Sequence, residues 1–134
     1  MRVLATIAMG IAGMFTLTAL AQEIAKRPEV PIMIEASSDL DACNATGIAT
    51  GLDPHGDGFL AVKSAPALQS LRIDKLYNGE QVYICNERDD WYGVVYSKDR
   101  RDCNVSTPWP QNLAYTGPCR SGWVYRRWIE VTGG

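Results

Sequence analysis

Four short segments set the architecture expected for this chain: GFLAVK at 58–63, LYNGEQV at 76–82, WYGV at 91–94 and GWV at 122–124. Aliphatic and aromatic residues dominate them, and glycine or asparagine separates them, which is typical of short strands joined by turns. Asn78-Gly79 is a strong turn signal. Residues 81–86 alternate, with Val82 and Ile84 on one face, which predicts a half-buried strand. The chain is therefore expected to be all-β.

The other predicted elements surround these segments. The run DPHGDG at 53–58 predicts a turn, and 63–70, which contains Pro66, predicts a long loop. Little helical periodicity is present. We expect strands at 46–52, 59–62, within 71–76, and at 81–86, 91–96, 122–125 and 129–131, with a tight helical turn at 126–128.

The order of these motifs resembles the bacterial Src-homology-3 family, small exported barrels with the pattern LxVRxxP…LxxGxxV…WxxV…GWV. The resemblance covers roughly residues 46–132. It implies a small Src-homology-3-like barrel of five to six short strands. The chain departs from the family between Tyr96 and Gly122, where about twenty-five residues replace a short hairpin. We expect this long loop to be ordered and functional.

Residues 1–21 are predicted to be a signal peptide. Arg2 precedes an uncharged apolar run, and Ala19-Leu20-Ala21 has the small-x-small form of a cleavage site. A permanent transmembrane helix is the alternative, but the run is only about 18 residues long. Cleavage near Ala21 would leave 134 − 21 = 113 residues, enough for one small domain. This predicts a periplasmic or secreted protein with no stable membrane anchor.

The segment 22–42 is expected to be an N-terminal extension or linker, and the barrel is expected to occupy 43–134. Pro28 and Pro31 interrupt any helix. The apolar residues at 32–34 could still pair as an edge strand.

The four cysteines form an even set in a chain predicted to be exported, which favours two disulfides. No two of them are spaced like zinc ligands. Three pairings are possible. We favour Cys103 with Cys119, because this bond closes a proline-rich loop with little apolar content, and hence Cys43 with Cys85.

Several classes of function are disfavoured. The net charge of −2 is small and no basic face is evident, so we expect no nucleic-acid partner. The 53–58 turn echoes a calcium loop, but its twelfth place is Ser64, where such a loop needs glutamate. His55 is the only histidine and the cysteines are expected to be bonded, so we expect no catalytic residues, metal or cofactor.

The aromatic residues are the better candidates for function. Tryptophan and tyrosine combine a large apolar face with a polar tip, which suits binding surfaces. Trp123 is expected in the core, and Trp109, between two prolines, is expected to be exposed for contact. The candidate ligand-binding residues are Trp91, Tyr92, Trp109, Tyr115 and Trp128.

The resemblance implies an exported, non-catalytic binding module for cell-wall (peptidoglycan) peptides. The ligand would lie against Trp91, Tyr92 and the 63–70 loop. The alternative is a periplasmic protein-interaction factor, such as an inhibitor or an envelope-assembly partner, that binds through the 97–121 loop.

Overall fold

The computed structural model describes residues 29–134, so the predicted signal peptide and its cleavage site lie outside the described residues. The described part is all-β, with one short 3₁₀ turn, η1, at Arg126–Trp128. The fold class predicted from the sequence is therefore confirmed at this level. The strands are β1 Met33–Ile34, β2 Ala45–Ala49, β3 Leu60–Lys63, β4 Arg72–Leu76, β5 Gln81–Arg88, β6 Trp91–Tyr96, β7 Leu113–Ala114, β8 Arg120–Tyr125 and β9 Ile129–Gly133.

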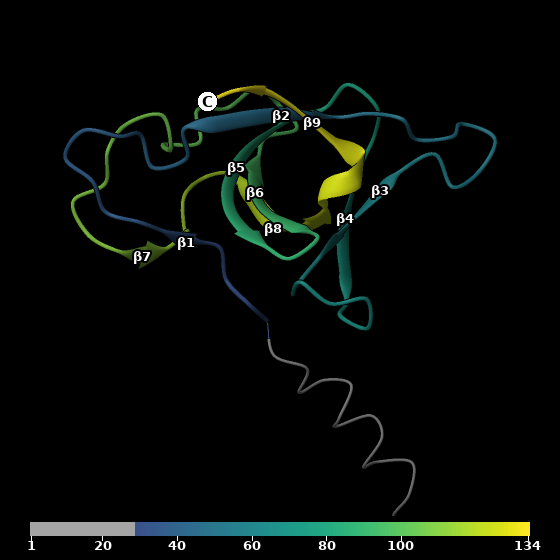
Figure 1. Cartoon of the computed structure of the whole chain (residues 1–134), viewed down its shortest axis with the longest axis horizontal. Helices are drawn as coiled ribbons and strands as arrows, with labels where there is room; N and C mark the ends of the chain where they lie inside the picture. Colours follow the sequence, from purple (N-terminus) through teal and green to yellow (C-terminus); the bar gives the residue numbers. More distant parts are fainter. Residues whose placement is uncertain (1–28) are drawn as a thin grey trace, which may run out of the picture.

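Seven of these strands form one antiparallel sheet, in the order β4-β3-β8-β6-β5-β2-β9. Its centre is the meander β5-β6-β8, which curves through the middle of the molecule between β1-β7 and β3-β4 (Figure 1). β4 and β9 are the two edges and do not pair with each other, so backbone hydrogen bonds do not close this sheet into a barrel. A separate two-stranded pair joins β1 to β7.

One face of the curved sheet holds what we call the inner core. The alternation predicted for 81–86 is confirmed, because Val82 is fully buried here and Ile84 packs beside it. Every strand of the large sheet contributes to this cluster. Its buried members are Ala49, Leu52, Leu60, Val62, Leu76, Val82, Val94, Tyr96, Val124 and Ile129.

The opposite face of the meander is also buried, by what we call the outer core. Trp123 is 1% exposed there, as predicted, and its indole Nε1 donates a hydrogen bond to the Val30 carbonyl at 2.8 Å. The layer that covers this face comes from 29–43 and from the long loop 97–119. The buried members are Ile32, Ile34, Cys43, Trp91, Val95, Cys103, Val105, Tyr115 and Trp123.

The segment 29–42 packs as an N-terminal extension of the fold and not as a linker, and its residues 33–34 pair as a strand. β1 pairs with β7 of the long loop, and the exposed fractions of Ile32 and Ile34 are 2% and 1%. Further backbone hydrogen bonds join 37–43 to 105–109. Burial of the two isoleucines supplies the free energy that orders a proline-interrupted segment.

Two disulfides fasten this outer layer. Cys43 is bonded to Cys85 and Cys103 to Cys119, the pairing favoured from the sequence. The first bond ties the end of the extension to β5, and the second closes the long loop. Two such bonds indicate an oxidising compartment, extracellular or periplasmic. Within residues 29–134, no helix has the length and apolar character needed to cross a membrane.

Candidate functional site

A groove of about 370 Å³ opens between the inner core, which contributes Leu52 and Leu60, and the outer core, which contributes Trp91. Its walls come from the 51–59 connection, the β3–β4 hairpin, the start of β6 and the end of η1. These parts meet because β3 pairs with β8, which leads directly into η1. The groove is lined by Leu52, Asp53, Asp57, Gly58, Phe59, Leu60, Ala61, Lys63, Leu68, Trp91, Tyr125 and Trp128.

Aromatic rings make up much of this lining. Trp91 stacks on Tyr125 with ring centroids 4.3 Å apart, so the two rings hold each other in place. Trp128 lies over Gly51, where a Cβ atom would come within 3.5 Å of the indole. Gly51 has a φ of 75°, a conformation that favours glycine. Rigid rings beside an open space form a surface suited to non-covalent binding.

The hairpin wall is shaped by local hydrogen bonds. The Lys63 ammonium donates to the carbonyls of Leu68 and Ser70, both at 3.2 Å, and so fixes the loop between β3 and β4. Leu68 is held at the groove with 62% of its surface exposed. Two cationic side chains, Lys75 and Arg72, lie over the Phe59 ring, at 4.4 and 5.1 Å from its centroid.

A partly buried polar network anchors the same hairpin to the meander. Asp74 of β4 accepts hydrogen bonds from the Tyr96 hydroxyl of β6 at 2.6 Å and from the Arg120 guanidinium of β8 at 2.9 Å. Burial opposes ionisation of Asp74, but these two hydrogen bonds, a third from the Lys75 N–H and the charge of Arg120 together lower the pKa of the carboxyl. Burial and the bond to Asp74 raise the pKa of Tyr96. The network keeps the outer strand of the groove wall in position.

Of the five candidate binding residues, Trp91 and Trp128 line the groove. Tyr92 does not. It follows Trp91 on β6, and successive side chains of a strand point to opposite faces, so it packs against the inner core with Arg126 over its ring. The groove therefore includes Trp91 and part of the 63–70 loop, as well as Trp128, but not Tyr92.

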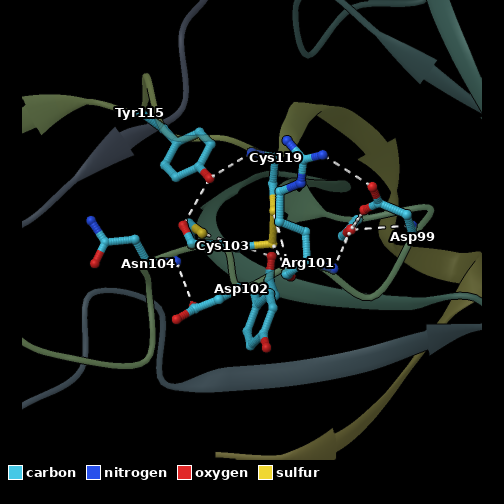
Figure 2. Close-up of a disulfide and its surroundings, with 10 residues drawn as sticks. Asp99, Arg101, Asp102, Cys103, Asn104, Tyr115 and Cys119 are labelled. Atoms are coloured by element: carbon cyan, nitrogen blue, oxygen red, sulfur yellow. Dashed lines mark hydrogen bonds and ion pairs between the residues drawn. A yellow bond between two sulfur atoms is a disulfide. The ribbon is translucent and has the colours of Figure 1, made fainter.

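Tyr115 lies in the interior of the long loop, 7% exposed, and does not line the groove. Figure 2 shows its hydroxyl between the two halves of the Cys103–Cys119 bridge. The hydroxyl donates to the Cys103 carbonyl at 2.8 Å and accepts from the Cys119 N–H at 3.2 Å. The ring thus satisfies backbone groups that the disulfide draws out of regular structure.

Trp109 was expected to be exposed, but it is half-buried. Its indole Nε1 donates to the Asn104 carbonyl at 2.7 Å, and its ring packs near Tyr115 with centroids 6.2 Å apart. The two flanking prolines do not hold the ring outward. One edge still borders a shallow hollow formed with 36–38, Pro108 and Pro110.

Phe59, Leu68 and Tyr125 were not selected from the sequence, although all three line the groove. Leu68 lies in the loop expected to contact the ligand, but a single leucine in a loop does not by itself indicate a binding site. Tyr125 becomes recognisable only through its stacking on Trp91, which lies on a different strand.

Across 29–134, no three side chains of histidine, cysteine, aspartate or glutamate are grouped so that they could hold a metal ion. His55 lies in an exposed turn, where its backbone N–H donates to Asp53 at 2.8 Å. The arrangement is suited to holding a ligand by contact and charge.

Comparisons with known proteins provide no further guidance, because no protein-family model, no curated protein and no solved structure matches this chain.

Proposed function

We propose that this protein is a non-catalytic binding module of the bacterial periplasm or exterior, and that its groove takes cell-wall (peptidoglycan) peptides. The observation that carries the proposal is the groove itself, in which Trp91, Trp128 and the exposed Leu68 surround an open space of about 370 Å³. This volume is near the low end of ligand sites, which span about 300–1,000 Å³. It suits a short peptide.

The proposal includes the resemblance to Src-homology-3-like barrels. Three features support it: the meander β5-β6-β8, a β3–β4 hairpin with a long connecting loop, and a 3₁₀ turn between β8 and β9. The sequence also predicted a long loop at 63–70 and a tight helical turn at 126–128, and the structure has a connection at 64–71 and η1 at Arg126–Trp128. The two disulfides are consistent with an exported chain.

A second candidate is a protein-interaction factor that acts through the 97–121 loop. The observation that favours it is the shallow hollow beside Trp109, with a volume of about 500 Å³. Partner binding there would require the loop surface and would not depend on the groove.

The test is co-sedimentation of the oxidised mature protein with purified cell-wall sacculi. The informative variant is Leu68→Asp, because Leu68 is 62% exposed and lines the groove. Leu40→Asp is a matched control, since Leu40 is 60% exposed and lies outside the groove. Trp109→Ala tests the loop.

Pelleting that is lost in Leu68→Asp but kept in Leu40→Asp and Trp109→Ala would support the proposal. Loss in Trp109→Ala alone would move the site to the long loop. Wild-type protein that stays in the supernatant would contradict wall binding and direct attention to protein partners.

A further inference from the structure

The groove contains charges that the protein does not neutralise. Four ion pairs are present within 29–134, namely Lys98–Glu80, Arg101–Asp99, Arg120–Asp74 and Arg126–Glu87. None of them involves Asp53, Asp57 or Lys63, the three charged residues that line the groove. Other exposed carboxylates, such as Asp41, also lack an ion pair, but in the groove unpaired charges of both signs face one open aromatic surface.

The two signs lie at opposite ends of the groove's β3 wall. Asp53 and Asp57 belong to the turn that precedes Phe59, and Lys63 is the last residue of β3. From 59 to 63 the chain advances four residues, which corresponds to roughly 13 Å in an extended strand. An extended ligand of about four residues therefore spans from the acidic end to the basic end.

The polar atoms at each end are available to a ligand. Asp53 uses Oδ1 to accept the His55 N–H at 2.8 Å, and Asp57 is exposed. The Lys63 ammonium donates to two carbonyls, and an ammonium group has three protons to donate. One donor thus remains for an anionic group, while its position is already fixed by the other two.

We infer that the groove selects a zwitterionic short peptide, with a free ammonium group at the Asp53–Asp57 end and a free carboxylate at Lys63. The inference rests on the proposed function and specifies its ligand class. Between the two charged ends, the peptide lies against Phe59, Leu68 and Trp128. A longer internal segment of a protein chain lacks both terminal charges and is disfavoured.

The experiment uses tetra-alanine in four forms: free, N-acetylated, C-amidated and capped at both ends. Binding to the oxidised mature protein is followed by tryptophan fluorescence or NMR titration at low ionic strength. Each cap removes one charge-assisted contact, so each is expected to weaken binding about five- to twentyfold. Paired protein variants then assign each end.

In the Asp53→Asn/Asp57→Asn variant, acetylation of the peptide should no longer weaken binding, whereas amidation should still weaken it. Lys63→Gln should show the reverse pattern. Asp41→Asn, which is exposed and outside the groove, is the control and should respond to both caps. This crossed pattern cannot arise from a loss of folding.

Equal affinity for all four peptides, or no binding of any form at millimolar concentration, would overturn the inference. The sacculus assay decides the proposed function separately. If the protein pellets with sacculi through its groove but binds all four peptides equally, the proposed function stands and only the zwitterionic ligand is refuted.

Discussion

At the scale of single residues, Asp74 has a role that its place in the sequence does not suggest. It lies on the edge strand β4, and one of its oxygens accepts hydrogen bonds from both Tyr96 and Arg120. Three strands therefore meet at one carboxylate. Its contribution depends on charge, because the protonated form accepts these bonds less strongly.

The free energy of unfolding in acid should depend on the charge of the Asp74 carboxylate. The pKa of Asp74 is lowered from its ordinary 3.8 in the folded state, so its contribution is fully present above about pH 4 to 5 and is lost as the pH falls through the lowered pKa. We expect the free energy of unfolding, measured with urea from pH 6 to pH 2, to fall less steeply in Asp74→Asn than in wild type.

The substitution should also lower stability at neutral pH, by about 1–3 kcal/mol, because it replaces a charged acceptor in a partly buried network. A parallel decrease at every pH, with the same acid slope as wild type, would show that the charge of Asp74 contributes nothing to the network.

Single residues also show which positions the sequence could predict and which it could not. The core position of Trp123 was predictable because glycine and valine flank it in a strand pattern. The places of Tyr115 and Trp109 were not, because both depend on hydrogen bonds to backbone groups of the long loop. An aromatic residue between prolines has the same local sequence whether its indole faces solvent or a carbonyl.

At the scale of secondary-structure elements, the strongly patterned strands were predictable, whereas for the weakly patterned pair the sequence allowed an edge strand at 32–34 but did not indicate its partner. The residues of β6 were predicted at 91–96 as observed, and β5 was predicted from its alternation. β1 and β7 contain two residues each and pair across 79 to 81 positions of sequence. Such short strands have no periodicity to detect, and burial of their side chains orders them.

The two residues of β1 permit a direct test of this explanation. Ile34 is 1% exposed and Met33 is 43% exposed on the other face of the same strand. Ile34→Ala should cost about 2–5 kcal/mol of unfolding free energy, because it opens a cavity in the outer core. Met33→Ala should cost much less, within about 1 kcal/mol.

Chemical denaturation of the oxidised protein would measure both changes. Similar small losses for the two variants would mean that the extension contributes little free energy to the fold and that the original expectation of a linker describes its energetics better.

At the scale of the whole molecule, the notable feature is that two cores share one wall. The meander β5-β6-β8 has the inner core on one face and the outer core on the other. The sequence could predict that β5 has two dissimilar faces. It could not predict that both would be covered, because the cover comes from 29–43 and 97–119, which lack strand patterns of their own.

For the same reason the groove was only partly predicted, because Trp91 and Trp128 meet Leu68 only in the folded chain.

A shared wall predicts that the two cores unfold together. Far-UV circular dichroism follows the whole sheet, whereas three of the four tryptophans that fluoresce, Trp91, Trp109 and Trp123, belong to the outer core or pack against it. We expect both signals to give the same urea midpoint and slope, as for a small two-state domain. Ile34→Ala should shift both curves equally. A fluorescence transition at lower urea than the circular dichroism transition would instead show that the outer layer detaches on its own.

The arrangement of the disulfides has a consequence for how the protein is made. The first cysteine in the chain is bonded to the second and the third to the fourth. A polypeptide that enters an oxidising compartment with its N-terminal end first presents Cys43 and Cys85 before either remaining thiol. Oxidation in order of arrival therefore forms the native bonds directly, with no exchange between mismatched sulfurs. Biogenesis of this chain should then require an oxidant for its thiols but no disulfide isomerase.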